Sequence, residues 1–245
     1  MRAILFDLFE TLVSHFDPDW SPPIRSTAER LGVDQKFFDE NWGRFEKQWE
    51  AGTIEQYDHA LAQLCAAAGV PSSEPTFAEL KREYIAYAAR TAFIQAEPTI
   101  VGMLRALKAS GLKLGVVTNA NDLDSAPWEQ HELARYFDVF VASHAVRLLK
   151  PDRRIYELAC ERLEVQPSET VFVGDGGSNE LWGAKSAGIQ PFWCTWFLDR
   201  WPEGIRPNGF SGDAWRQHPS NNQAPYRRIR RPDDLLALVA EPPAA

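Results

Sequence analysis

The segment Ala3–Leu12, with the sequence AILFDLFETL, constrains the fold of this chain more than any other stretch. Its apolar residues Ile4, Leu5 and Phe6 run directly into the carboxylate of Asp7. A short apolar run of this kind is typical of a strand buried on both faces of a parallel sheet. In open parallel sheets, ligand-handling groups lie at the carboxyl ends of the strands. Asp7 is therefore a candidate nucleophile or metal ligand, although a carboxylate here can also simply cap the following turn.

Three later segments bring further polar side chains to the end of an apolar run or to a helix start. The segments are LGVVTN (114–119), LLKPDRRIY (148–156) and TVFVGDGGSNE (170–180). The polar side chains that they carry are Thr118, Asn119, Lys150, Asp175 and Glu180. Taken one at a time, such residues can equally be helix caps, surface charges or turn residues. Their order along the chain is therefore what carries information.

From Pro98 onward, predicted helices alternate with short strands rich in β-branched residues. The helices are predicted over 98–110, 127–136, 152–163, 179–187 and 233–239, and the strands over 113–118, 139–142, 170–174 and 189–193. This alternation indicates right-handed crossovers and a parallel sheet covered by helices on both faces. In such a sheet, one edge carries four of these polar residues: Asp7, Thr118, Lys150 and Asp175. That shared edge is the physical reason to treat them as one site.

The interval between residues 15 and 93 has the pattern of four amphipathic helices. Large aromatic side chains recur at spacings of four, three and four residues, as on one buried face of a helix. They are Phe38, Trp42, Phe45 and Trp49. Capping signals set the expected ends of the helices. They are Ser21, Thr53 and Thr76 at helix starts, and Gly32 and Gly69 at helix ends. Inward apolar faces on these helices predict a small bundle.

The order Asp, Thr, Lys and Asp/Glu at these positions resembles the four motifs of the haloacid dehalogenase superfamily of hydrolases. The resemblance extends over about residues 1–195 and includes the intervals between the motifs. It implies an α/β fold, with a doubly wound, Rossmann-like parallel sheet core and an inserted helical-bundle cap. The core is then expected at residues 1–14 and 94–245, and the cap at residues 15–93. In this family the cap closes over the active site, excludes water and supplies the substrate-selecting surface.

A carboxylate at a strand end, beside a divalent cation and a lysine, stays ionised and can attack phosphorus or carbon. We therefore expect Asp7 to be the nucleophile and an aspartyl ester to be the intermediate. The resemblance implies that Thr118 and the backbone N–H of Asn119 hold a phosphoryl oxygen. Lys150, a compact point charge, would balance the negative charge shared by Asp7 and the phosphoryl group.

The same site has the donor atoms of a magnesium centre. Asp7, Asp175 and Glu180 offer carboxylate oxygens of the kind that Mg²⁺ prefers. The resemblance adds the main-chain carbonyl two residues past the nucleophile, which here belongs to Phe9 and survives any change of side chain. Mg²⁺ is therefore the expected cofactor.

Phe9 occupies the position at which phosphatases of the family carry a second Asp, which protonates the leaving oxygen and later activates water. Such general acid–base help is typically worth roughly 10²–10⁴-fold, and phenylalanine cannot supply it. The dehalogenase branch also lacks this Asp, often with an aromatic residue in its place, because halide needs no proton to leave. However, dehalogenases have lost the metal-binding Gly-Asp of the fourth motif, which this chain keeps as Gly174-Asp175. Dehalogenases of the family also have an arginine that binds the substrate carboxylate. The expected cap offers Arg25, Arg30 and Arg44, but no motif matches any of them to that role.

These features favour a Mg²⁺-dependent phosphatase that acts on a small phosphorylated metabolite. Two alternatives stay open: a metal-independent 2-haloacid dehalogenase, and a non-catalytic binding protein of the same fold. Residues 199–225, rich in Pro, Gly, Asn and Trp, predict either an ordered surface excursion or a functional segment. In the functional case they would form a flap at the rim of the site or a contact within a homodimer. Residues 241–245 are expected to be a frayed tail.

Composition argues against several other classes of partner. A net charge of −8 and a pI near 5.2 provide no electrostatic footprint for nucleic acid or an anionic membrane. The basic cluster Arg227, Arg228, Arg230 and Arg231 predicts a solvated strand face. Apolar runs stay well below the ~20 residues that span a bilayer, and no signal peptide is expected because Met1 opens directly onto a strand. The three cysteines Cys65, Cys160 and Cys194 are odd in number, widely spaced and set in apolar contexts, which predicts reduced, buried thiols in a cytoplasmic protein.

Overall fold

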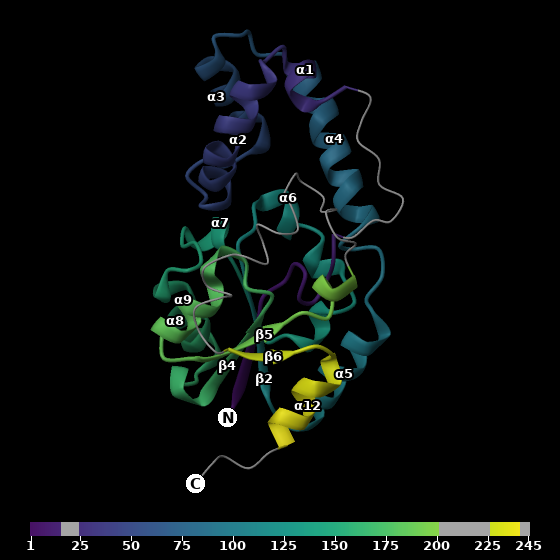
Figure 1. Ribbon diagram of the computed structural model, residues 1–245, viewed down its shortest axis with the longest axis vertical. Coiled ribbons are helices and arrows are strands. Elements are labelled where there is room, and N and C mark those ends of the chain that lie inside the picture. Colours follow the sequence, from purple (N-terminus) through teal and green to yellow (C-terminus); the bar gives the residue numbers. More distant parts are fainter. Residues whose placement is uncertain (16–24, 201–225, 241–245) are drawn as a thin grey trace.

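One sheet of six parallel strands forms the centre of the molecule, in the order β3-β2-β1-β4-β5-β6 (Figure 1). The computed structural model describes residues 1–15, 25–200 and 226–240. The strands are β1 (Ala3–Phe6), β2 (Lys113–Thr118), β3 (Val139–Ala142), β4 (Thr170–Gly174), β5 (Gln190–Cys194) and β6 (Arg227–Ile229). The strand order reverses beside β1, so the carboxyl ends of β1 and β4 lie at the position where open α/β sheets bind ligands.

Helices cover both faces of the sheet, as the alternating pattern predicts. The helices α5 (Pro98–Ala109) and α12 (Pro232–Ala240) lie on one face, and α8 (Arg153–Leu163) and α9 (Glu180–Ser186) lie on the other. Because successive strand residues point to opposite faces, Ile4 and Phe6 join one hydrophobic cluster while Ala3 and Leu5 join the other. The predicted doubly wound α/β fold is confirmed.

Four further helices pack around a third hydrophobic cluster of their own. They are α1 (Thr27–Leu31), α2 (Gln35–Glu50), α3 (Tyr57–Ala68) and α4 (Glu74–Arg90), which we call the helical bundle. Phe45 and Trp49 of the predicted aromatic stripe are buried in this cluster, and Phe38 and Trp42 pack against it. Figure 1 shows the bundle beyond the sheet edge that carries α6 (Asp122–Ser125) and α7 (Ser143–Val146). The division into a core (1–14 and 94–245) and a cap (15–93) stays a prediction.

Helix ends in the bundle were predicted better than helix starts. Gly32 and Gly69 end their helices in the left-handed region, with φ of 70° and 71°. The predicted start at Thr76 was wrong, because α4 begins two residues before it. Ser26 caps α1. Ser21 lies outside the described residues. The Thr53 hydroxyl donates to the main-chain oxygen of Gln48 rather than capping α3.

The predicted helix over 127–136 was also wrong. Two short 3₁₀ turns occupy this stretch, η1 (Trp128–Gln130) and η2 (Ala134–Tyr136). The buried Trp128 ring stacks on Phe140 of β3 with a centroid distance of 5.1 Å, which draws the segment onto the sheet. The other short turns are η3 (Pro167–Glu169), η4 (Gly177–Asn179) and η5 (Leu198–Arg200).

Other sequence expectations concern the surface and the cysteines. The described ranges contain no helix that is long and apolar enough to cross a membrane. Cys65, Cys160 and Cys194 are free and buried, as predicted. Arg227 and Arg228 lie exposed on β6, and Arg228 pairs with Asp199 at 2.7 Å. The proposed flap lies almost wholly in residues 201–225, outside the described residues, as does the tail 241–245.

Candidate active site

Asp7, Lys150 and Glu180 form a buried ion-pair network at the carboxyl edge of the sheet. Asp7 directly follows β1, and its N–H donates to the main-chain oxygen of Val173 at 2.9 Å. Lys150 Nζ donates to Asp7 Oδ1 and to Glu180 Oε2, each at 2.5 Å. All of these side chains are less than a tenth exposed. Residues more than 170 positions apart in the sequence therefore share one ammonium group.

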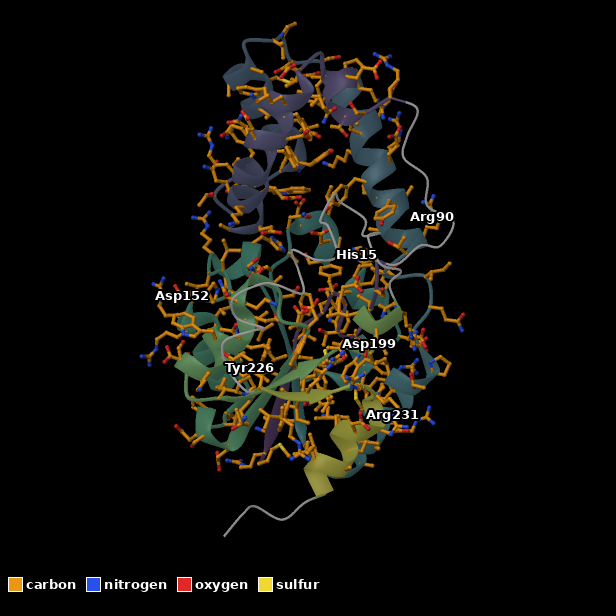
Figure 2. All side chains as sticks on the ribbon, in the orientation of Figure 1. His15, Arg90, Asp152, Asp199, Tyr226 and Arg231 are labelled. Carbon is orange, nitrogen blue, oxygen red and sulfur yellow. The ribbon has the colours of Figure 1, made fainter. Side chains whose placement is uncertain are left out.

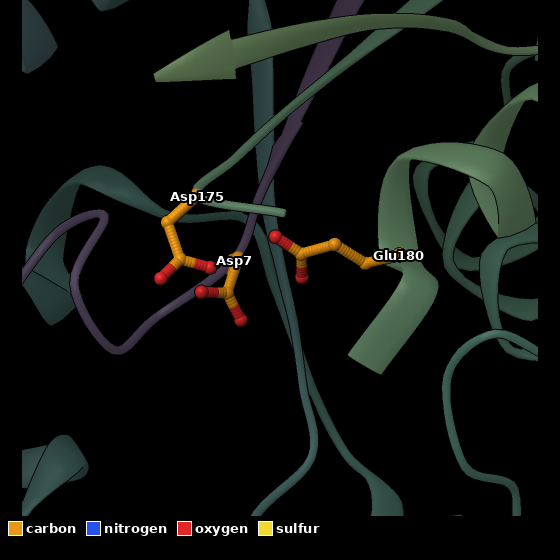
Figure 3. Close-up of side chains that lie close together, drawn as sticks. All are labelled: Asp7, Asp175 and Glu180. Carbon is orange, nitrogen blue, oxygen red and sulfur yellow. The ribbon is translucent and has the colours of Figure 1, made fainter. Parts of the chain in front are cut away.

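Asp175 completes the acidic cluster from the end of β4. Figure 3 shows the carboxylates of Asp7, Asp175 and Glu180 turned toward one another. Asp175 Oδ1 accepts from the N–H of Gly177 at 2.9 Å. Asp175 Oδ2 is buried and has no hydrogen-bond partner in the described part of the chain. A buried carboxylate oxygen without a donor is costly, so its presence calls for a compensating group.

The turn between β4 and α9 is shaped so that Glu180 can reach this cluster. A Cβ at Gly174 would meet Glu180 Oε1 and a ring carbon of Phe172, so only glycine leaves room for the carboxylate. Glu180 Oε1 also accepts from the N–H of Gly176 at 3.0 Å. The hydroxyl of the buried Tyr156 donates to the main-chain oxygen of Glu180 at 2.9 Å and ties α8 to the start of α9.

The electrostatics of the cluster show that negative charge is in excess. Burial, followed by the neighbouring Glu180 and Asp7, raises the pKa of Asp175 well above its ordinary value. Burial and Asp7 raise the pKa of Glu180 to about 7, although Lys150 opposes them. Burial alone would lower the pKa of Lys150, but the Asp7 and Glu180 carboxylates outweigh burial and raise it. One lysine is therefore not enough for the three carboxylates.

The donor set fits a divalent cation that prefers oxygen ligands. Asp7, Asp175 and Glu180 each offer an oxygen within 4.8 Å of the others. The orphaned Asp175 Oδ2 supplies a free ligand atom in this group. Buried carboxylate oxygens are the ligands that Mg²⁺ and similar hard cations select. The residues present therefore suit the metal that the sequence predicts.

Thr118 and Asn119 end β2, beside the carboxyl end of β1. Thr118 is fully buried, and its hydroxyl lies 3.5 Å from the main-chain oxygen of Asn119. The Asn119 side chain accepts from the N–H of Lys150 at 2.8 Å and donates to the Lys150 carbonyl at 3.2 Å. Asn119 thus clamps the main chain that carries the lysine. The sequence predicted a role only for the backbone N–H of Asn119, not for this side-chain contact with Lys150.

The Phe9 side chain is packed against two neighbouring rings. Its ring stacks on His15 with a centroid distance of 4.5 Å and meets Phe93 edge-on at 6.2 Å. The adjacent Glu10 has a φ of 56°, and its carboxylate accepts from Ser14 Oγ at 2.9 Å and from the His15 N–H at 2.8 Å. Glu10 therefore stabilises the turn after Asp7. Figure 2 labels His15 between the sheet and the bundle.

Thr11 is a residue of the site to which the sequence analysis assigned no role. It is fully buried, and its hydroxyl lies 3.2 Å from Asp7 Oδ2. Lys150 holds the other oxygen of the same carboxylate. The only available signal was the spacing of four residues between Asp7 and Thr11, which the turn after β1 brings into contact.

Comparisons with known proteins agree on the family and diverge on the activity. The family model for haloacid dehalogenase-like hydrolases matches residues 1–188. The chain is 29% identical over 204 residues to (S)-2-haloacid dehalogenase 1 of Pseudomonas sp. (strain CBS-3), covering 78% of this chain and 82% of the relative. It is 28% identical over 191 residues to phosphoglycolate phosphatase 1 of Pseudomonas aeruginosa, covering 77% and 67% of the two chains.

A solved structure matches nearly the full length of the chain. The HAD phosphatase from Thermococcus onnurineus superposes with a TM-score of 0.57 at 25% identity, over 98% of each chain. Dehalogenases and phosphatases are thus both among the relatives, and both are hydrolases. From its motifs, its sheet and its matching family model, the chain belongs to the haloacid dehalogenase-like hydrolases.

Proposed function

We propose that the protein is a Mg²⁺-dependent phosphatase that acts on a small phosphorylated metabolite through an aspartyl-phosphate on Asp7. The observation that carries this proposal is the buried Asp175 Oδ2 without a donor, within a cluster of carboxylates that one lysine cannot neutralise. A metal-independent enzyme would leave that charge uncompensated in the protein interior. We also place the enzyme in the cytoplasm, where its three buried thiols would stay reduced.

The residues of the site then take the following roles. Asp7, Asp175 and Glu180, with the main-chain carbonyl of Phe9, would hold Mg²⁺, which when bound neutralises charge on the phosphoryl oxygens. Asp7 attacks phosphorus, and the bond from phosphorus to the leaving oxygen breaks. Thr118 and the N–H of Asn119 bind a phosphoryl oxygen, and Lys150 balances the charge. Water then hydrolyses the aspartyl-phosphate, which releases phosphate and restores the Asp7 carboxylate.

One observation favours a second candidate, a metal-independent 2-haloacid dehalogenase. Phe9 stands where phosphatases of the family carry the Asp that protonates the leaving group. The carboxylate of the neighbouring Glu10 accepts hydrogen bonds from Ser14 and His15. Halide departs without a proton, so this arrangement would cost a dehalogenase nothing. A third candidate, a binding protein without turnover, would also tolerate the missing acid.

Turnover assays with and without metal separate these candidates. The purified protein is assayed against a panel of phosphate esters and against 2-chloropropionate, in Mg²⁺ and in chelator. We expect phosphate release that requires Mg²⁺, and we expect Asp7→Asn to abolish it while the melting temperature stays similar, because an amide cannot attack. Halide release in chelator would establish the dehalogenase instead. Residual activity of Asp7→Asn above about one per cent would show that another residue is the nucleophile.

A further inference from the structure

Two residues, one at the end of β5 and one in the turn after it, contact Thr11. Cys194, the last residue of β5, is fully buried, and its Sγ lies 3.5 Å from Thr11 Oγ1. Trp196 Nε1 donates to the main-chain oxygen of Thr11 at 2.8 Å. Thr11 is thus held at its side chain by the last residue of β5 and at its main chain by the turn that follows.

The direction of the hydrogen bonds in this contact follows from proton counting. The Asp7 carboxylate, paired with Lys150, can only accept. The Thr11 hydroxyl has a single proton, which it donates to Asp7 Oδ2 at 3.2 Å. Thr11 Oγ1 is then left as an acceptor, so the Cys194 thiol must donate to it. Burial raises the pKa of Cys194 well above its ordinary value, which keeps the thiol protonated for this purpose.

These hydrogen bonds, from Cys194 to Thr11 and from Thr11 to Asp7, restrict the rotation of the Asp7 carboxylate. Lys150 holds Oδ1 at 2.5 Å, and Thr11 holds the other oxygen, Oδ2, at 3.2 Å. A nucleophile attacks efficiently only when its reacting oxygen is aligned with the electrophile. A Thr11 hydroxyl that is free to rotate away from Asp7 would loosen this alignment, and the Cys194 thiol limits such rotation.

We propose that Cys194 is a positioning residue, which acts through the Thr11 hydroxyl to fix the Asp7 carboxylate in the orientation for attack. This inference rests on the proposed role of Asp7 as the nucleophile. It assigns a part in the reaction to Cys194, which the sequence predicted only to be a reduced, buried thiol.

Cys160 provides a matched control that distinguishes a positioning role of Cys194 from a purely structural one. Cys160 of α8 is also buried, and its Sγ lies 3.8 Å from the hydroxyl of Thr170. It belongs to the cluster on the other face of the sheet, whereas Cys194 belongs to the cluster that includes Phe6. Cys160→Ala therefore removes the same atoms from a comparable environment without touching Thr11.

Steady-state kinetics on the best ester of the panel, in saturating Mg²⁺, test the proposal. We expect Cys194→Ala to lower kcat by about tenfold, the equivalent of one lost hydrogen bond in the transition state, with KM nearly unchanged. Cys194→Ser keeps a donor at this position and should recover most of kcat. Cys160→Ala should keep kcat even if its melting temperature falls as far as that of Cys194→Ala. Equal loss of kcat in both alanine variants, or no recovery in Cys194→Ser, would reduce Cys194 to a packing residue.

The infrared S–H stretching band provides a readout that does not need turnover. The band of Cys194 is identified as the one lost in Cys194→Ala. It should shift toward the frequency of a free thiol in Thr11→Val and stay in place in Thr11→Ser, while the Cys160 band does not move. A Cys194 band that ignores Thr11→Val would overturn the inference. If no phosphate ester of the panel is hydrolysed, the proposed function is wrong. The infrared band then still tests the hydrogen bond between Cys194 and Thr11.

Discussion

At the scale of single residues, protons and the proposed Mg²⁺ would compete for the same buried carboxylates. The pKa of Glu180 rises from 4.5 to about 7 in the folded chain. The stability that this shift contributes is complete below pH 4.5 and is lost as the pH rises through 7. The metal-free protein is therefore penalised above neutrality, where the carboxylates repel one another. A bound cation would remove this penalty and would lower the pKa of both Asp175 and Glu180.

We expect Mg²⁺ to raise the melting temperature, and to raise it more at pH 8 than at pH 5.5, because protons no longer occupy the ligands. Thermal denaturation with Mg²⁺ or chelator at both pH values measures this difference. Asp175→Ala should abolish the rise and leave the metal-free protein as stable as wild type or more so, since it relieves repulsion. Asp39→Ala, an exposed position on α2, is the control and should keep the full rise. A wild type that ignores Mg²⁺ and is fully active in chelator would contradict the phosphatase proposal.

The missing acid at Phe9 leads to a prediction about leaving groups. Without a proton donor the leaving oxygen must depart unaided, so aryl and acyl phosphates should be cleaved much faster than alkyl phosphates. Phe9→Asp should selectively speed alkyl esters, by up to roughly 10²-fold. Phe9→Asn, which loses the same stacking on His15 but carries no acid, is the matched control. Rates across aryl phosphates of graded leaving-group acidity measure the effect.

Glu10 is the other acid that could fill this role. Its carboxylate is occupied by Ser14 Oγ and by the His15 N–H, so we expect Glu10→Gln to leave the dependence on leaving-group acidity unchanged. A flat dependence in wild type that becomes steep in Glu10→Gln would show that Glu10 supplies the proton and that our interpretation of Phe9 is wrong.

At the scale of elements, the inner end of α2 docks the bundle onto the short helices after β2 and β3. Ser143 Oγ donates to the main-chain oxygen of Glu50 at 2.6 Å, and Trp49 Nε1 donates to Asp122 Oδ1 at 2.6 Å. A Cβ at Gly52 would overlap the main-chain oxygen of His144, which shows how closely the α2–α3 turn meets α7. The carboxylate of Glu50 lies in this junction, where burial, Glu46 and Asp124 raise its pKa from 4.5 to about 7.

Glu50 should make the stability of the folded chain depend on pH. Its folded pKa is raised, so its favourable contribution is complete below pH 4.5 and is lost as the pH rises through 7. Glu50→Gln cannot ionise and should be more stable than wild type at pH 8, by about 1–3 kcal/mol, and nearly equal to it at pH 5. Urea unfolding at the two pH values measures the difference. Glu40→Gln, exposed on the same helix, should change stability little at either pH; the same gain from Glu50→Gln at both would exclude the carboxylate as its source.

The strands were predicted more accurately than the helix ends, for a physical reason. β2, β3 and β4 have the predicted bounds, because each contains a short apolar run that the sheet largely buries. Capping signals are short and arise without a helix behind them, as at Thr53, whose hydroxyl bonds to Gln48. Over 127–136, packing of Trp128 on Phe140 overrides the helical pattern.

At the scale of the whole molecule, one sheet with two helical layers positions the site, and the bundle lies beyond the site's edge (Figure 1). All strands run parallel, so every carboxyl end meets this edge. The site therefore draws Asp7 from β1, Thr118 from β2 and Asp175 from β4, while Lys150 approaches from the segment before α8. Two hydrophobic clusters pack against the two faces of the sheet, and a third lies within the bundle.

The sequence by itself determined the strand pattern and, through parallel topology, that Asp7, Lys150 and the fourth-motif acids share one edge. Periodicity encodes such features locally, and the sheet merely brings them together. Only the tertiary structure decided that Asn119 clamps Lys150, that Glu10 supports a turn and that Cys194 reaches Thr11. Those contacts depend on loop dihedrals, such as the positive φ of Glu10, and on packing between segments up to 183 residues apart, which no local pattern records.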